Sequence, residues 1–77
     1  MKTEVKIRLS SIEDVRNFVE VVRQFEGDID LASGRYIVDA KSIMGIFSLD
    51  LMKPILLTAY GEASEQLLKD LTPYIVA

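Results

Sequence analysis

The chain has no cysteine, no histidine and no tryptophan among its 77 residues. Without cysteine it can form no disulfide bond and perform no thiolate chemistry, so the core must hold without covalent cross-links. Without histidine it lacks the usual general base of enzymes, the commonest metal ligand and the side chain that carries a phosphohistidine. We therefore expect a protein that is not an enzyme.

Basic clusters and long apolar runs are missing as well. Nine Lys and Arg residues face twelve Asp and Glu residues, which gives a net charge of −3. Nucleic acid requires a concentrated basic face, so we expect no nucleic-acid partner. The first residues, MKTEVKIRL, lack an apolar signal core, and no segment reaches about 18 apolar residues. We expect no membrane partner and a cytoplasmic location.

Sites for metals and cofactors are also absent from the sequence. No glycine-rich phosphate loop, nucleophile triad or catalytic carboxylate pair is visible. The aspartates at positions 28, 30, 39 and 50 do not have the spacing of a metal-binding loop. We expect neither a metal nor a cofactor.

What remains has the composition of an ordinary folded protein, with 49% hydrophobic and 27% charged residues. Residues 1–77 are short enough to form a single domain. Alternating apolar residues predict strands at 5–9, 28–31, 36–39 and 55–60, and helical spacing predicts helices at 12–25, 43–49 and 63–71. The order β-α-β-β-α-β-α predicts a two-layer α+β sandwich with helices on one face of a sheet.

Capping and turn residues mark the ends of these elements. Ser10 or Ser11 can cap the first helix, with Glu13 and Asp14 in its first turn, and Gly27 suits a left-handed cap at its end. A hairpin turn is expected at residues 33–34, an N-cap at residue 42, and a helix stop before residue 73, which is a proline.

The element order and the segment FEGDIDLASGRYIVDAKSIMGIFSL, residues 25–49, resemble the HPr family. HPr is the phosphocarrier of the bacterial sugar phosphotransferase system. The resemblance implies an open-faced β-sandwich, in which three helices cover one face of a four-stranded antiparallel sheet of order 1-4-2-3.

The KSIMG sequence at residues 41–45 is similar to the regulatory serine site of this family. In Gram-positive members a dedicated ATP-dependent kinase phosphorylates that serine, so the resemblance makes Ser42 a candidate regulatory phosphorylation site. The residues alone indicate a plain helix N-cap at Ser42, since any helix can begin with serine.

One departure from the family concerns the active site. HPr carries its active histidine in a G-I-H-A-R-P segment at the start of the first helix. The corresponding segment here, LSSIEDVRNF at residues 9–18, has no histidine and no Arg-Pro pair. Glu13 and Asp14 place negative charge where a phosphate would need a positive partner. Ser10, Ser11, Glu13 and Asp14 therefore form a degenerate active-site loop, and we expect no phosphohistidine.

Apolar residues lie all around the helix expected at 43–49. Such a short helix is either fully buried or partly exposed for a partner. The resemblance implies that Ile43, Met44 and Phe47 dock a protein partner, with core packing as the alternative, whereas Ile46 and Leu49 are expected in the core. Arg16 is a further candidate for partner contact, although a solvated helix face is the default for it.

Two hypotheses about function follow. The first is a non-catalytic HPr-like protein that regulates sugar uptake or carbon catabolite control through protein partners. HPr kinase, a LacI-type regulator and phosphotransferase-system enzymes are the candidate partners. The second is an HPr-fold scaffold or self-associating protein with no role in phosphotransfer. We expect a monomer or a weak homodimer.

Overall fold

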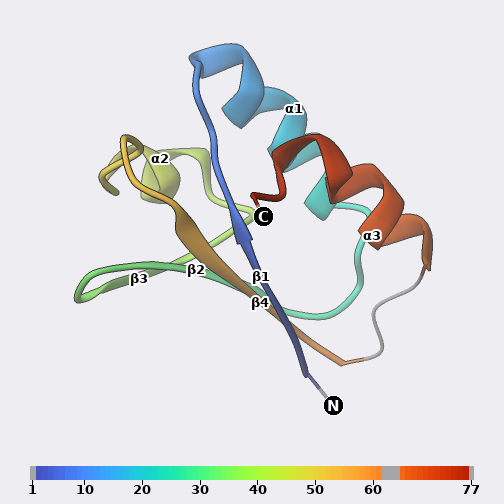
Figure 1. Ribbon diagram of the computed structural model, residues 1–77. Coiled ribbons are helices and arrows are strands. Elements are labelled where there is room, and N and C mark those ends of the chain that lie inside the picture. The colour runs from blue at the N-terminus through green and yellow to red at the C-terminus, as the bar shows by residue number, and fades with distance from the viewer. Residues whose placement is uncertain (1, 62–64, 77) are drawn as a thin grey trace.

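Figure 1 shows the computed structural model, which describes residues 2–61 and 65–76. The order of elements is the expected one. The strands are β1 (Lys2–Ile7), β2 (Ile29–Ser33), β3 (Tyr36–Asp39) and β4 (Ile55–Tyr60). The helices are α1 (Ile12–Val22), α2 (Ile43–Phe47) and α3 (Glu65–Leu71), followed by a 3-10 turn at Thr72–Tyr74.

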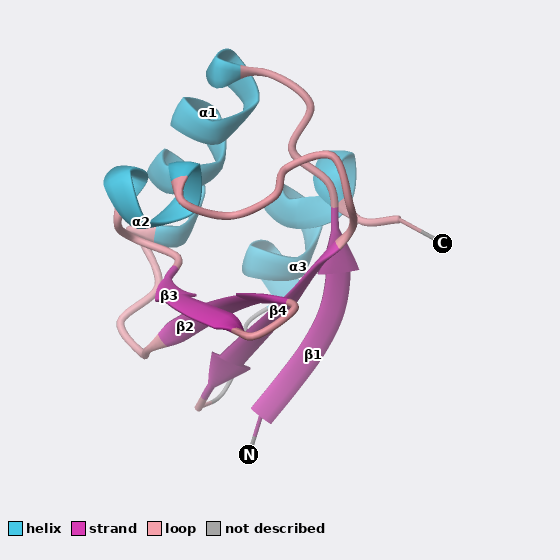
Figure 2. Ribbon diagram, turned by 90° about the vertical axis from the view of Figure 1, so that its left-hand side faces the viewer, coloured by secondary structure: helices cyan, strands magenta, loops and turns pink. Residues whose placement is uncertain are grey.

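The four strands form one antiparallel sheet in the order β1-β4-β2-β3, as the resemblance implied. β4 is central and pairs with both β1 and β2, so that Leu57 lies opposite Val5 on one side and Leu31 on the other. Figure 2 shows all three helices on the same face of this sheet. The α+β open sandwich is therefore confirmed.

The core lies between the sheet and α1 and follows the alternation of the strands. Ile55, Leu57 and Ala59 of β4 are buried toward the helices. From the opposite side, α1 contributes four buried residues, Val15, Phe18, Val19 and Val22. Burial of such side chains stabilises the fold by about 1.5–3 kcal/mol each relative to exposure.

The end of α1 differs from the prediction. The helix ends at Val22, and Phe25 lies half-buried in the following loop. The expected left-handed cap at Gly27 was wrong, since Gly34 and Gly61 are the glycines with positive φ in the described part of the chain. Gly27 is needed for close packing instead, because a Cβ there would collide with the Tyr60 carbonyl oxygen and the Phe25 ring.

Other boundaries also differ from the prediction. β1 ends at Ile7, so Leu9 is buried outside the strand, and α2 already ends at Phe47. The expected start of the last helix at residue 63 lies outside the described residues. Its end matches the prediction, because Pro73 falls in the 3-10 turn after Leu71.

Candidate functional site

The start of α1 and the loop after α2 meet at one end of the molecule. Residues 8–12 face Phe47, Leu51 and Met52 across a pocket of about 330 Å³. The Arg8 guanidinium donates a hydrogen bond of 3.0 Å to the Met52 carbonyl oxygen, which joins the two segments. The degenerate loop and α2 therefore form one continuous surface, although they are far apart in the sequence.

The first turn of α1 is closed by a reciprocal pair of side-chain hydrogen bonds. The Ser11 hydroxyl accepts from the Asp14 backbone N–H at 3.0 Å, and the Asp14 carboxylate accepts from the Ser10 backbone N–H at 3.0 Å. The arrangement resembles a capping box, except that the carboxylate accepts from the residue before the N-cap and not from the N-cap itself. Of the two serines proposed as caps, the structure selects Ser11.

Asp14 also influences the aromatic side chain packed beneath this turn. The Tyr74 ring meets the Phe18 ring edge-on, with a centroid distance of 5.7 Å and an interplanar angle of 83°. Burial, together with the negative charge of Asp14, raises the pKa of the Tyr74 phenol above its ordinary value of 10.0. The neutral phenol is therefore favoured beside this carboxylate.

Ser42 lies at the start of α2 and is exposed. Its hydroxyl accepts a 3.1 Å hydrogen bond from the Gly45 backbone N–H, and its own N–H donates to the Asp39 carbonyl oxygen at 3.0 Å. The predicted N-cap is thus confirmed. Gly45 fits because α2 packs closely on β3, where an added Cβ would lie only 3.2 Å from the Val38 Cβ.

Lys41, which precedes Ser42, ties α2 to the end of α1. Its ammonium group donates to the carbonyl oxygens of Phe25 at 2.6 Å and Gly27 at 3.1 Å. Both carbonyls belong to the loop that leaves α1, so the lysine fixes the start of α2 against that loop. This role was not predicted from the sequence, because no local pattern indicates it.

The apolar residues of α2 divide between core and solvent. Ile46 and Leu49 are buried, as predicted, and Ile43 is half-buried against the core. Met44 and Phe47 are 81% and 43% exposed. Two of the three candidate docking residues are therefore accessible to a partner.

Two further apolar side chains near this helix were missed by the sequence analysis. Ile12 is 67% exposed, although its spacing placed it on the buried stripe of α1, and Met52 is 79% exposed in the loop after α2. Ile12 begins the helix, where nothing packs over it. Met52 shows no signal in the sequence, because its position beside α1 depends on the tertiary fold.

The two arginines of α1 behave differently. Arg23 forms an ion pair with Glu20 at 3.7 Å, an exposed contact worth little stability. Arg16 is exposed, and among the described residues it has no hydrogen-bond or ion-pair partner. It lies one turn after Ile12, so both residues occupy the same face of α1.

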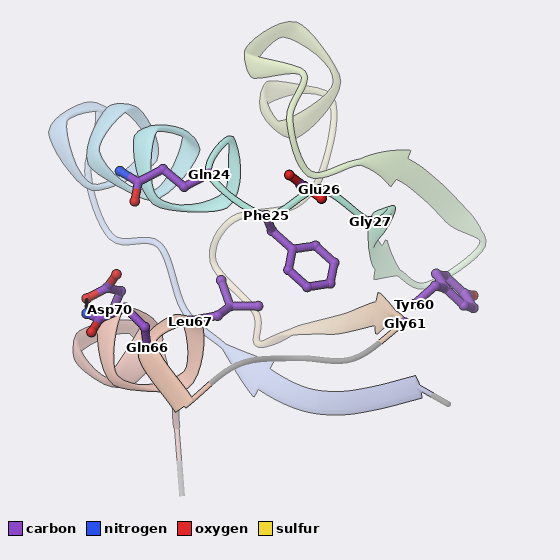
Figure 3. Close-up of a pocket in the computed structure, with 9 residues that line it drawn as sticks. All are labelled: Gln24, Phe25, Glu26, Gly27, Tyr60, Gly61, Gln66, Leu67 and Asp70. Atoms are coloured by element: carbon purple, nitrogen blue, oxygen red, sulfur yellow. Dashed lines mark hydrogen bonds between the residues drawn. The ribbon is translucent and has the colours of Figure 1, made fainter.

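A second pocket, of about 520 Å³, lies at the other end of α1 and is shown in Figure 3. The side chains of Phe25 and Leu67 point toward each other across it, and Glu26 and Asp70 contribute acidic groups to its lining. It contains none of the site residues proposed from the sequence.

Residues 2–61 and 65–76 contain neither a metal-binding cluster nor a membrane-spanning helix. No group of three His, Cys, Asp or Glu residues is placed to hold a metal ion in this part of the chain. None of its helices is long and apolar enough to cross a membrane.

Residues 14–76 match the family model of the HPr component of the phosphotransferase system, described as its phosphorylation site. The chain belongs to the HPr family. The matched region includes Ser42 and α2 but begins after Ser10 and Ser11. The HPr family match thus covers Ser42, the candidate phosphorylation site, and leaves out Ser10, Ser11 and Glu13.

Solved HPr structures are similar to this chain. Phosphocarrier protein HPr from Bacillus anthracis str. Ames is 28% identical, with a TM-score of 0.71, covering 99% of this chain and 96% of that one. HPr-C-His from Thermoanaerobacter tengcongensis is 26% identical, with a TM-score of 0.69, covering 95% and 88%. No curated protein matches the chain.

Proposed function

We propose that this HPr-family protein carries no phosphohistidine and acts as a non-catalytic interaction or regulatory protein of bacterial sugar uptake or carbon catabolite control. The observation that carries the proposal is the start of α1. There the chain has no histidine, the Ser11 hydroxyl accepts from the Asp14 N–H, and the Asp14 carboxylate accepts from the Ser10 N–H.

Charge at this position supports the same conclusion. A helix N-terminus attracts anions because its free N–H groups and dipole are positive. Here Glu13 and Asp14 already supply negative charge in the first turn, and Asp14 is held there by the Ser10 N–H. An incoming phosphoryl group would be repelled by both carboxylates.

Protein docking is assigned to the exposed apolar side chains on both sides of the pocket, which we name the α1–α2 surface. It consists of Ile12, Phe47 and Met52, which line the pocket, together with Met44, three residues before Phe47 on α2. Exposed apolar clusters of this kind mark interaction sites in soluble domains. Arg16, on the same face of α1 as Ile12, adds a guanidinium that has no partner within residues 2–61 and 65–76 and is suited to a carboxylate or phosphate of the partner.

Regulation is assigned to Ser42. Its hydroxyl is exposed at the N-terminus of α2, one residue from Ile43 and two from Met44. A phosphate would add about 1.5–2 negative charges there, and a helix N-terminus stabilises such a charge. Phosphorylation would therefore leave α2 folded and change the charge that a partner meets. HPr kinase is the proposed modifying enzyme, and a LacI-type regulator or phosphotransferase-system enzymes are the proposed docking partners.

The phosphorylation part is tested with HPr kinase and ATP, followed by intact mass measurement and peptide mapping. We expect a mass gain of one phosphate on the wild type and none on Ser42→Ala. The same protein incubated with phosphoenolpyruvate and Enzyme I should remain unlabelled. No mass gain from the kinase removes the role of Ser42, and labelling by Enzyme I removes the proposal that the phosphorelay is lost.

The docking part is tested by pull-down with phosphorylated and unphosphorylated protein. Phe47→Ser should abolish partner binding, whereas Tyr60→Ser should not, although Tyr60 is 44% exposed and thus closely matched to Phe47. Equal binding by both variants would contradict the assignment of the α1–α2 surface. Loss of self-association by Phe47→Ser, with no partner captured, would favour the scaffold hypothesis.

A further inference from the structure

The two edge strands of the sheet differ in their backbone hydrogen bonding to the rest of the chain. Beside β1, the C-terminal segment adds backbone contacts: the Val76 N–H donates to the Lys6 carbonyl oxygen at 2.9 Å, and the Arg8 N–H donates to the Tyr74 carbonyl oxygen at 2.7 Å. β3, at the opposite edge, pairs with β2 alone within the described residues. Figure 2 shows β3 at this margin of the sheet.

The open edge of β3 carries large apolar side chains. Ile37 is 70% exposed and Tyr36 is 66% exposed. Proteins usually protect an unpaired edge strand with charge, proline or a covering segment, because its free backbone groups can pair with another strand. In β3 the centre of the strand, at Ile37, has no such protection.

The register of the hairpin shows which backbone groups face outward. Ser33 pairs with Tyr36 across the two-residue turn, so these flanking residues exchange hydrogen bonds, and the pattern then alternates along β3. The Ala40 N–H donates to the Ile29 carbonyl oxygen at 2.9 Å, in agreement with that alternation. The N–H and C=O groups of Ile37 therefore point away from β2, toward the open edge.

The segment from Arg35, in the turn just before β3, to Asp39 is complementary to itself about Ile37. In an antiparallel pairing of two copies centred on this residue, Ile37 lies opposite Ile37 of the second copy, and Arg35 lies opposite Asp39. Arg35 has no partner among the residues that the structure describes. One Asp39 carboxylate oxygen accepts from the Lys41 N–H at 2.9 Å, and the other remains available.

Other symmetric registers fit less well. Residues that lie directly opposite must point to the same face, so the pairing can be centred on Ile37 or moved by one residue to Val38. Centring on Val38 would place apolar Ile37 opposite charged Asp39. The outward backbone groups of Ile37 and Asp39 could pair in either register, so the side chains decide between the two. The Ile37-centred register satisfies side chains and backbone together.

We propose that a second copy of this chain docks on the outer edge of β3, with Ile37 at the two-fold axis. The two four-stranded sheets then become one continuous antiparallel sheet, joined by the reciprocal Ile37 backbone bonds and two Arg35–Asp39 ion pairs. A strand of four residues gives a small interface, so the dimer is weak and reversible. This interface is separate from the α1–α2 surface and does not depend on the proposed function.

The ion pairs allow a charge-exchange test by sedimentation velocity up to millimolar protein. We expect the wild type to dimerise, and Arg35→Asp and Asp39→Arg each to dimerise about tenfold more weakly, because each replaces two attractions by repulsions. An equimolar mixture of these two variants should regain wild-type association, since every contact in the heterodimer then joins opposite charges. Circular dichroism checks that each variant is folded.

Several outcomes of this experiment would contradict the proposed dimer. A wild type that stays monomeric at millimolar concentration, or a mixture no more associated than its components, would overturn the proposal. Ile12→Glu serves as the control, because Ile12 is similarly exposed but lies on the α1–α2 surface. Loss of dimerisation in this control but not in Ile37→Glu would move the interface to that surface and also overturn the proposal.

A second measurement is independent of charge. Because the chain has no cysteine, an Ile37→Cys variant has a single thiol. Directly opposite residues of an antiparallel hydrogen-bonded pair have Cα atoms about 5.5 Å apart, within the range of a disulfide. Mild oxidation should cross-link Ile37→Cys faster than Met44→Cys, whose side chain is also exposed. Equal or slower cross-linking at residue 37 would contradict the two-fold axis.

Discussion

Lys41 and Phe25 are joined across the molecule by a hydrogen bond of 2.6 Å from the lysine ammonium group to the backbone carbonyl oxygen. The same ammonium group reaches the Gly27 carbonyl oxygen at 3.1 Å. These bonds connect the loop after α1 with the residue before Ser42. The position of the candidate regulatory serine is therefore set in part by the end of a helix that is distant in sequence.

Replacement of Lys41 by methionine should destabilise the protein by about 1–3 kcal/mol, because two carbonyl groups lose a charged donor. The free energy of unfolding in urea measures the effect. Lys53→Met is the matched control, since the Lys53 side chain is exposed and has no hydrogen-bond partner among the described residues. An equal, small loss in both variants would show that the Lys41 bonds contribute nothing to stability.

Gly27 should tolerate alanine less well than Gly34 does. A Cβ at Gly27 collides with the Tyr60 carbonyl oxygen and the Phe25 ring. Overpacking of this kind destabilises a protein by up to about 3 kcal/mol. Gly34 has φ of 61° and no atom near a new Cβ, so alanine there adds only backbone strain of about 1 kcal/mol. Thermal unfolding of Gly27→Ala and Gly34→Ala compares the two costs, and the reverse order would refute the packing argument.

The division of α2 into a buried and an exposed side predicts a large difference between neighbouring substitutions. Ile46→Ala should cost about 3 kcal/mol, because it leaves a cavity beneath the helix. Met44→Ala should change the free energy of unfolding by no more than about 0.5 kcal/mol, as expected for an exposed side chain. Similar losses for both variants in urea would mean that α2 packs through a different face.

Tyr74 should make stability depend on alkaline pH. Its pKa in the folded protein is raised by burial and by the charge of Asp14. The folded state therefore retains the phenol proton more tightly than the unfolded state does. This contribution to stability is complete below the unfolded pKa of about 10 and is lost as the pH rises through the higher folded pKa.

Urea unfolding at a series of pH values around 10 tests this effect, with Tyr74→Phe as the control that cannot ionise. The loss of stability with rising pH should be steeper for the wild type than for Tyr74→Phe, and Asp14→Asn should lessen the difference. Parallel curves for wild type and Tyr74→Phe would show that the phenol ionises equally easily in both states.

Local chemistry in the sequence was enough to predict the element order and several boundaries. β4 matches its predicted range from Ile55 to Tyr60, because its alternating residues lie between Pro54 and Gly61. An N-cap at Ser10 or Ser11 and another at Ser42 were also predicted, since a cap requires only a hydroxyl three residues before the N–H that it accepts from.

Predictions that depended on neighbours in space were less accurate. Ile12 fits the helical periodicity of α1 but is exposed. Periodicity predicts which face of a helix is apolar, and it does not predict how much of that face the rest of the protein covers. Gly27 was interpreted as a positive-φ residue, whereas the need for glycine comes from Tyr60 and Phe25. A glycine required by backbone conformation and one required by packing look identical in the sequence.

The sequence by itself determined the α+β sandwich, the absence of a histidine that could be phosphorylated, and the serine at the start of α2. These follow from residue type and short-range spacing. The tertiary structure alone decided that Ile12 and Met52 lie beside Phe47, that Lys41 binds the end of α1, and that the edge of β3 remains open. Such relationships arise when the sheet and helices pack, because packing brings together residues whose separation along the chain carries no local signal.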